Sequence, residues 1–381
     1  MDPIFSFRSG PKAYWISFKM TVPLLQAHGL TAKFNLGGGH HNGHHRHRHH
    51  HHEAEAEAAD FLKLFVFGDS YADTGNWPKS TAAICWKNPY GMTFPGKPSG
   101  RFSDGRILTD YLASFLGTSS PMPYNNWLKI SEESKLEYQY GLNFAHGGTG
   151  VFTTLVNGPN MTTQINVFQQ LVQEEEVYSS QNMSSSFALV SVAGNDYAAY
   201  LAKSGTTEDL PAFTKSIMSQ LILDLQRIHG LGVRKVGITA MPPLGCLPQM
   251  SASISHKNCS ETGNSLAKFH NQVLQENIEK LNNETGAPAF MILDLYKAFM
   301  SALNIRNNHP GNSTFEEQLS PCCVGSAEGY SCGSVNNIGI KKYIVCEDPK
   351  QSFFWDDIHP SQQGWEAVYS ALKPSLQNLF N

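Results

Sequence analysis

The fold prediction begins with the stretch Phe61-Leu-Lys-Leu-Phe-Val-Phe67 and with Gly68-Asp69-Ser70, which follows it directly. The first run is short, apolar, and rich in aromatic and β-branched residues, which predicts a buried strand. In α/β proteins, active groups gather just beyond the carboxyl ends of such strands. We therefore expect Ser70 to open a turn into a helix at the edge of a functional site.

Further stretches of the same kind alternate with helix-like stretches. The predicted strands are residues 187–196, 233–241 and 289–295, and the predicted helices are residues 213–229, 267–281 and 361–380. Strands that alternate with amphipathic helices predict βαβ units, with a mostly parallel sheet covered on both faces. Residues 60–381 are expected to form this one α/β domain.

The first 59 residues are expected to lie outside that domain. Arg8 and Lys12 suit the start of a secretion signal, but Lys19 interrupts its apolar stretch and no clear cleavage site follows. Residues 37–59 are of low complexity, with a His/Arg tract at 40–52 and then EAEAEAA. Such a tract is compatible with metal binding, a tag or a linker, and none of these gives it a catalytic role. We predict an N-terminal segment, residues 1–59, with an atypical signal and a His-rich linker.

Composition excludes several classes of protein. The chain has 381 residues, 41% of them hydrophobic, and a formal net charge of −4. That is enough apolar material for a full core, and the charge favours neither nucleic-acid binding nor disorder. No apolar run of membrane-spanning length is present, so no integral membrane segment is expected.

Cysteines and glycosylation sequons indicate the secretory pathway. Asn-x-Ser/Thr triplets occur at Asn160, Asn182, Asn258, Asn283 and Asn312. Oxidising conditions would let six of the seven cysteines pair, and Cys85 is our prediction for the one left over.

Two segments at opposite ends of the predicted domain suit nucleophilic catalysis. A serine hydroxyl such as that of Ser70 needs a base to take its proton. The turn Asp356-Asp-Ile-His359 lets a carboxylate orient one imidazole nitrogen and leaves the other free for the serine. Taken singly, each segment is equally compatible with an ordinary turn or helix cap. Together they predict a Ser70, His359 and Asp356 triad.

Two blocks between them suit the stabilisation of an oxyanion. The glycine-rich stretch Gly141–Gly150 lets a backbone N–H approach a substrate closely, and the amide of Asn195 is a second donor. The alternatives are a flexible loop for the first block and a helix cap for Asn195. His146 is not assigned the role of base, because no carboxylate close in sequence would orient it.

These blocks resemble the four motifs of a known family. Phe67-Gly-Asp-Ser70, Asn143-Phe-Ala145, Gly194-Asn-Asp196 and Asp356-x-x-His359 are similar to those of GDSL esterase/lipases, the SGNH hydrolases. Further features resemble the plant members, and the likeness covers nearly all of residues 61–381. These features are Gly100–Arg106, Pro242–Cys246, the Cys322-Cys323 pair and Phe354-Trp355-Asp356. One departure is His146, where many relatives have serine.

The resemblance implies a three-layer α/β/α flavodoxin-like fold and an esterase or lipase of carboxylic esters. It makes Ser70 the nucleophile and Asp356 and His359 its partners. The oxyanion hole would use the Ser70 N–H, the Asn195 amide and a glycine of the second block. We choose Gly148, with Gly147 an equally placed neighbour. The resemblance also favours a Cys246–Cys259 disulfide, with other disulfides among Cys322, Cys323, Cys332 and Cys346.

Two alternatives to ester hydrolysis are considered. The same acyl-enzyme would make the protein an acyltransferase if an alcohol replaced water, and a protein of this fold can also be a catalytically silent binding protein. No cofactor or metal is implied, and the expected partner is a small-molecule or lipid ester. Phe94, Phe144, Phe152 and Trp355 are candidates for an acyl pocket, although core packing is the commoner role of such residues.

Overall fold

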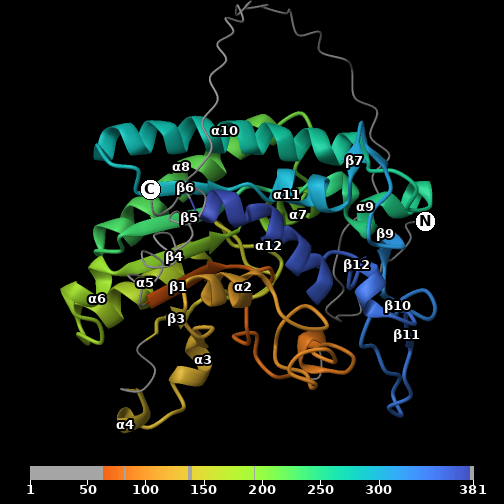
Figure 1. Cartoon of the computed structure of the whole chain (residues 1–381), viewed down its shortest axis with the longest axis horizontal. Coiled ribbons are helices and arrows are strands. Elements are labelled where there is room, and N and C mark those ends of the chain that lie inside the picture. Colours follow the sequence, from red (N-terminus) through yellow and green to blue (C-terminus); the bar gives the residue numbers. More distant parts are fainter. Residues whose placement is uncertain (1–62, 81–82, 136–139, 193, 378–381) are drawn as a thin grey trace, which may run out of the picture.

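The computed structural model describes residues 63–80, 83–135, 140–192 and 194–377 (Figure 1). The predicted N-terminal segment, with its His-rich tract, lies outside the described residues. Within them, no helix is long and apolar enough to cross a membrane.

A six-stranded parallel sheet forms the centre of the molecule. Its strands are β1 (Lys63–Gly68), β2 (Met122–Pro123), β3 (Leu142–Asn143), β4 (Ser186–Ser191), β5 (Lys235–Thr239) and β6 (Phe290–Leu293). Their spatial order is β2-β3-β1-β4-β5-β6, and every neighbouring pair is parallel. Without the short edge strand β2, this is the flavodoxin strand order. The strands remain parallel, but the sequence of strands across the sheet reverses its direction between β1 and β4.

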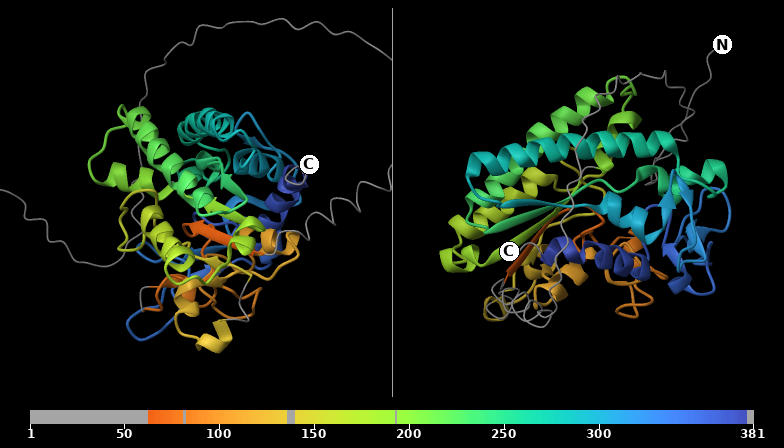
Figure 2. Two further views of the ribbon diagram at one scale, coloured as in Figure 1. Left: turned by 90° about the vertical axis from the view of Figure 1, so that its left-hand side faces the viewer. Right: turned by 45° about the horizontal axis from the view of Figure 1, so that its top comes forward.

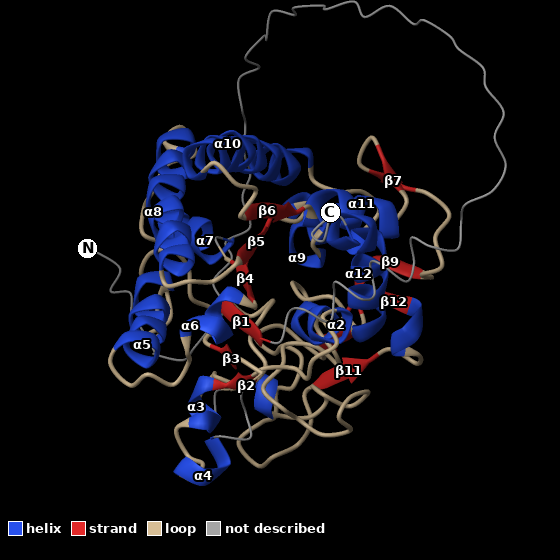
Figure 3. Cartoon of the chain, turned by 60° about the vertical axis from the view of Figure 1, so that its left-hand side comes forward, coloured by secondary structure: helices blue, strands red, loops and turns tan. Residues whose placement is uncertain are grey.

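Helices cover both faces of the sheet. Helices α5 (Met161–Gln173), α8 (Leu210–Gly230) and α10 (Glu261–Thr285) pack on one face, and α2 (Leu108–Phe115), α11 (Leu295–Ala302) and α12 (Gln362–Gln377) on the other (Figures 2 and 3). The parallel sheet covered on both faces, which the alternating pattern predicted, is therefore confirmed, and so is the three-layer α/β/α fold that the family resemblance implies. Strands β1 and β4 are buried along their whole length, which explains why their sequences are almost continuously apolar.

Some predicted boundaries are wrong. The strand predicted over residues 187–196 ends at Ser191, and Gly194–Ala202 is a helix, α7. The strand predicted over 289–295 ends at Leu293, because Asp294 caps α11 by accepting a hydrogen bond from the Lys297 N–H. The helices predicted over 213–229 and 267–281 are real but longer, as α8 and α10.

The remaining elements are short. They are η1 (Ile84–Trp86), α3 (Tyr124–Trp127), α4 (Glu132–Lys135), α6 (Ser180–Ser184), η2 (Leu244–Cys246), α9 (Pro248–Ser251), η3 (Ala252–Ile254), β7 (Ile305–Arg306), β8 (His309–Pro310), β9 (Glu317–Pro321), β10 (Cys323–Gly325), β11 (Tyr343–Val345), η4 (Pro349–Gln351) and β12 (Ser352–Phe354). Strand β12 pairs in parallel with β9, and β10 pairs with β11 as an antiparallel hairpin. These two pairs lie next to one another, outside the central sheet (Figure 1).

Three disulfides link the chain, and two of them close the β10–β11 hairpin. Cys322 pairs with Cys346 and Cys323 with Cys332. The Cys246–Cys259 bond implied by the family resemblance is present, and Cys85 is free, as predicted; its side chain is also buried. Burial raises the pKa of the Cys85 thiol well above its ordinary value.

Candidate active site

The predicted site residues meet where the strand order reverses. Ser70 follows β1, the glycine-rich block follows β3, and Asn195 lies in the first turn of α7, after β4. These three strands are neighbours in the sheet, so their carboxyl ends share one edge. Ligands of open α/β sheets bind at this position.

The backbone at Gly68 sets the direction of the chain that carries Ser70. Gly68 has a φ of +133°, and a Cβ there would lie 1.8 Å from the carbonyl oxygen of Ser191. Only glycine allows this close approach, after which the Asp69 N–H donates to the same Ser191 oxygen at 2.9 Å. The end of β1 is thus locked against the end of β4.

The helix expected to begin at Ser70 does not form. The carbonyl of Asp69 accepts hydrogen bonds from the N–H groups of Ala72 and Asp73, which makes one turn, and residues 74–80 continue without a helix. The Asp73 carboxylate ends the turn by accepting hydrogen bonds from the N–H groups of Gly75 and Asn76. These short side-chain bonds satisfy N–H groups that would otherwise begin a helical ladder.

Ser70, His359 and Asp356 form a continuous chain of hydrogen bonds. The Oγ of Ser70 lies 2.8 Å from Nε2 of His359, and Nδ1 of His359 lies 2.9 Å from both carboxylate oxygens of Asp356. Asp356 and His359 are buried, whereas Ser70 is partly exposed. This arrangement has the geometry required of a nucleophile, its base and the group that orients the base.

Asp356 is held as a carboxylate by an unusually complete set of donors. It accepts hydrogen bonds from the Tyr90 hydroxyl at 2.7 Å and from the N–H groups of Ile358 and His359. Burial alone would raise the pKa of Asp356, but the charge and hydrogen bonds of His359, with these N–H groups, hold it below its ordinary value. The carboxylate therefore remains ionised beside the imidazole at neutral pH.

The imidazole of His359 is also fixed by packing. The Phe102 ring lies with its centroid 5.2 Å from that of the imidazole, and the Tyr71 ring approaches it at 5.8 Å. The Tyr71 hydroxyl donates to the carbonyl of Ile358, and the Ser103 hydroxyl donates to the carbonyl of Pro360. These contacts hold the turn that carries His359 against the turn that carries Ser70.

Hydrogen bonding distinguishes the two glycines of the second block. The N–H of Gly147 donates to the Asp73 carboxylate at 2.9 Å, whereas no described residue accepts a hydrogen bond from the N–H of Gly148 or of Ser70. Gly148 has a φ of +72°, the left-handed conformation that glycine adopts without strain. The Gly148 and Ser70 donors are therefore available to a ligand, and the Gly147 donor is occupied.

The amide of Asn195 faces the same two blocks. Its Nδ2 donates to the carbonyl of Thr149 at 2.9 Å and makes a long contact of 3.5 Å with the carboxylate of Asp69. Burial raises the pKa of Asp69 to about 7, against the opposing effects of the Tyr71 N–H and the His359 charge. The long contact leaves one amide hydrogen of Asn195 weakly engaged.

Several buried polar residues that support the site were not predicted. Gln164 bonds both the N–H and the carbonyl of Gly68, and Asn76 donates to the carbonyls of Asn143 and Ala145. Asp196 accepts hydrogen bonds from the N–H groups of Val151 and Phe152, and burial raises its pKa to about 6. The sequence signals were the Asp73-x-Gly-Asn76 turn pattern and the Gly194-Asn-Asp196 block, whereas nothing in the local sequence marks Gln164.

His146 and two of the candidates for an acyl pocket are buried and packed against neighbouring aromatic side chains. His146 is buried, its Nδ1 lies 3.0 Å from the Gly147 oxygen, and its ring lies beside Trp77. Of the candidates for an acyl pocket, Phe144 and Trp355 belong to the core. Phe144 stacks on Phe67, and Trp355 packs on Tyr90.

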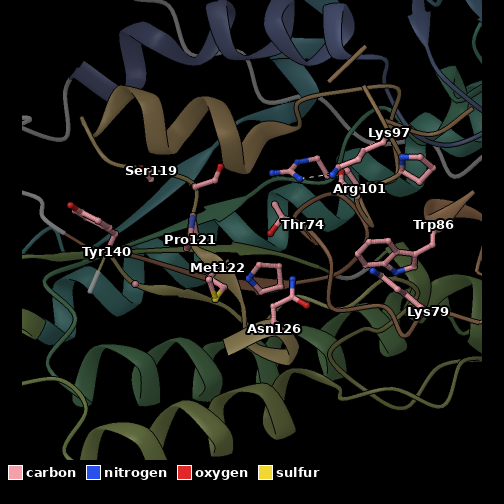
Figure 4. Close-up of a pocket in the computed structure, with 15 residues that line it drawn as sticks. Thr74, Lys79, Trp86, Lys97, Arg101, Ser119, Pro121, Met122, Asn126 and Tyr140 are labelled. Atoms are coloured by element: carbon pink, nitrogen blue, oxygen red, sulfur yellow. Dashed lines mark hydrogen bonds between the residues drawn. The ribbon is translucent and has the colours of Figure 1, made fainter. Parts of the chain in front are cut away.

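A cavity of about 620 Å³ is lined by residues outside the predicted site (Figure 4). Its lining includes Thr74, Trp86, Arg101 and Met122, but none of the triad or predicted oxyanion residues. Arg101 is already paired with Asp110 through two hydrogen bonds. Among the described residues, no group of three or more His, Cys, Asp or Glu side chains is arranged to hold a metal ion.

Known GDSL esterase/lipases are similar to this chain over most of its length. The family described as GDSL-like Lipase/Acylhydrolase matches residues 64–372. Two GDSL esterase/lipases of Arabidopsis thaliana are 52% and 50% identical to the chain, over 82% and 84% of its length and 86% and 89% of theirs. Acetylajmalan esterase 2 of Rauvolfia serpentina is 28% identical over 83% of this chain and 90% of its own. The chain therefore belongs to the GDSL-like lipase/acylhydrolase family and is a carboxylic ester hydrolase.

Proposed function

We propose that the protein hydrolyses carboxylic esters of small molecules or lipids through an acyl-enzyme on Ser70. The observation that carries the proposal is the hydrogen-bonded chain from the Ser70 hydroxyl through His359 to Asp356, with distances of 2.8 and 2.9 Å. A serine in such a chain loses its proton to the imidazole as it attacks a carbonyl.

In the first step, the Ser70 Oγ attacks the ester carbonyl carbon while His359 Nε2 takes the hydroxyl proton. The carbonyl oxygen becomes an oxyanion, and Asp356 stabilises the imidazolium that forms. Collapse of this tetrahedral intermediate breaks the ester C–O bond, and His359 returns the proton to the leaving alcohol. The acyl group is then esterified to Ser70.

We assign the oxyanion to the N–H groups of Ser70 and Gly148 and to the amide of Asn195. The first two have no acceptor among the described residues, and the third has only one short hydrogen bond. Donors that are already oriented cost no reorganisation when charge develops in the transition state. The occupied N–H of Gly147 favours Gly148 for this role.

In the second step, water attacks the acyl-enzyme. His359 takes a proton from the water, a second oxyanion forms in the same hole, and collapse releases the carboxylic acid as His359 returns the proton to Ser70 Oγ. The family description names acylhydrolases, which favours water over an alcohol as the acyl acceptor.

The experiment is hydrolysis of a p-nitrophenyl ester series of increasing acyl length by the wild type and Ser70→Ala. Ser114, which is exposed on α2, supplies a matched control as Ser114→Ala. We expect Ser70→Ala to lower kcat by roughly 10³-fold or more and Ser114→Ala to leave it unchanged. Equal activity of the wild type and Ser70→Ala would refute the proposed nucleophile.

We also infer that the protein enters the secretory pathway. Three disulfides support this, because such bonds persist in oxidising compartments. Two of the sequon asparagines, Asn283 and Asn312, are exposed. Expression in plant cells should give a protein whose gel mobility increases on glycosidase treatment, and Asn283→Gln with Asn312→Gln should reduce that shift. A protein with no glycosidase-sensitive mass would contradict the inference.

A further inference from the structure

The hairpin closed by two disulfides carries an exposed apolar tip. Ile338, Ile340 and Ile344 are 79%, 54% and 57% exposed. With Tyr330 and Val335, they make up five of the eleven exposed large apolar side chains in the described part of the chain, all within residues 330–344. We call these five residues the hydrophobic tip. Such a concentration of exposed apolar side chains marks an interaction surface.

The hydrophobic tip is held rigidly in this exposed conformation. Val335 and Lys341 form a β-bridge, and the side chain of Asn336 accepts hydrogen bonds from the N–H groups of Ile338 and Ile340. The Cys323–Cys332 and Cys322–Cys346 disulfides close the base of the same segment. The loop is therefore held by backbone and disulfide bonds that do not use the isoleucine side chains, which stay exposed.

The charge of this segment differs from that of the chain. Lys341 and Lys342 are its only charged residues between positions 329 and 346, although the whole chain has a net charge of −4. Lys341 lies over the Tyr343 ring at 4.6 Å and Lys342 near the Tyr330 ring at 5.9 Å, so both cations lie next to apolar side chains. Apolar side chains with flanking lysines match the boundary between acyl chains and anionic headgroups.

The shape of the segment also favours a lipid surface over a protein partner. The β10–β11 hairpin projects from the end of the molecule where β12 lies (Figure 1). A stable protein interface buries about 800 Å² on each side, which demands a broad complementary surface. Insertion of a narrow projecting tip into a lipid layer needs no complementary surface.

The hairpin is tied directly to the segment that carries the triad. The N–H of Cys322 donates to the carbonyl of Phe354, and the N–H of Cys323 donates to the carbonyl of Trp355, the residue before Asp356. We propose that the hydrophobic tip docks the enzyme on anionic lipid surfaces and thereby brings the active site to esters held in them. Binding to lipid does not require ester hydrolysis, so this inference goes beyond the proposed function.

The test is sedimentation of the full chain, as Ser70→Ala to prevent hydrolysis, with vesicles of phosphatidylcholine alone or mixed with phosphatidylglycerol. The tip variant is Ile338→Ser, Ile340→Ser and Ile344→Ser together, and the charge variant is Lys341→Gln with Lys342→Gln. The matched control is Leu223→Ser with Ile254→Ser, which removes exposed apolar side chains of α8 and η3.

We expect the tip variant to lower partitioning to mixed vesicles by roughly tenfold or more and the control to leave it unchanged. The charge variant should weaken binding to mixed vesicles and leave binding to phosphatidylcholine unchanged. Near-UV circular dichroism of each variant verifies the fold. The proposal is overturned if the parent protein does not bind vesicles, if the folded tip variant binds as well as the parent, or if the tip variant only converts a dimer into a monomer. Because these proteins lack the nucleophile, a failure here is separate from a failure of the proposed esterase.

Discussion

The two halves of the active site are built in different ways. The half with Ser70, Gly148 and Asn195 follows three adjacent strands of the central sheet, β1, β3 and β4. The half with Asp356 and His359 follows β12, which pairs with β9 outside that sheet. Backbone register positions the first half, because β1 and β4 are aligned from Lys63–Ser186 to Gly68–Ser191.

The second half depends instead on side chains that are distant in the sequence. Tyr90 bonds Asp356, Tyr71 bonds Ile358, and Ser103 bonds Pro360, across separations of 266, 287 and 257 residues. The difference teaches that Ser70 is placed by the central sheet, whereas His359 is placed by a set of individually replaceable contacts. Substitutions in the two halves should therefore lower activity by different amounts.

The largest effect should come from removing the bond that joins the two halves. Ser70→Ala and His359→Ala should each lower kcat by roughly 10³- to 10⁶-fold, and the double variant should be no worse than the more damaged single variant. The reason is that a nucleophile and its base act as one unit. Single-turnover and steady-state rates with p-nitrophenyl acetate measure this. If the loss of kcat in the double variant equalled the product of the two single losses, Ser70 and His359 would act independently.

A smaller loss should follow from removing one donor of the first half. Asn195→Ala should lower kcat by roughly 10²- to 10³-fold with little change in KM, because the oxyanion exists only in the transition state and intermediates. Asn283→Ala, on the exposed face of α10, is the control. A change in KM with kcat intact would assign Asn195 to ground-state binding instead.

The loss of one contact in the second half should lower kcat/KM by a smaller factor. Tyr90→Phe removes the 2.7 Å hydrogen bond to Asp356 and leaves the bonds from His359 and the backbone. We expect kcat/KM to fall about tenfold, corresponding to about 1.4 kcal/mol. Tyr178→Phe is a matched control, since Tyr178 is buried and no described residue bonds its hydroxyl. Equal activity of both variants would remove Tyr90 from the positioning of Asp356.

The last prediction concerns the pH dependence of stability in the first half and no loss of catalytic rate. The pKa of Asp69 is about 7 in the folded protein and near 3.8 when unfolded, so the folded state binds the extra proton between these values. Its contribution to stability is therefore fully present below pH 4 and declines as the pH rises toward 7. Asp69→Asn should abolish this decline, which amounts to a few kcal/mol at most. Urea unfolding of both proteins at pH 4.5 and 7.5 measures it, and an identical pH dependence would contradict the assignment.

Sequence patterns predicted the residues of the first half of the site better than the buried polar residues that hold them in place. The apolar run before Gly68 and the donors after it mark the ends of buried strands, since strand periodicity and turn residues are local properties. Ser70, Asp356 and His359 were singled out because a nucleophile, a base and an orienting carboxylate are needed together, and those roles remain a proposal. The helix expected at Ser70 was wrong because the buried carboxylate of Asp73 captures the N–H groups of the following turn.

By itself, the sequence determined the parallel α/β class, four of the six central strands, the family resemblance, and the residue types available for chemistry. Only the tertiary structure decided which of these residues meet. Ser70 and His359 are 289 residues apart, and their 2.8 Å contact depends on the sheet order and on Tyr71, Tyr90 and Ser103. It also decided between Gly147 and Gly148 as available donors, because the N–H of Gly147 is bonded to Asp73. Local propensities act over a few residues, whereas these contacts form only when distant segments pack together.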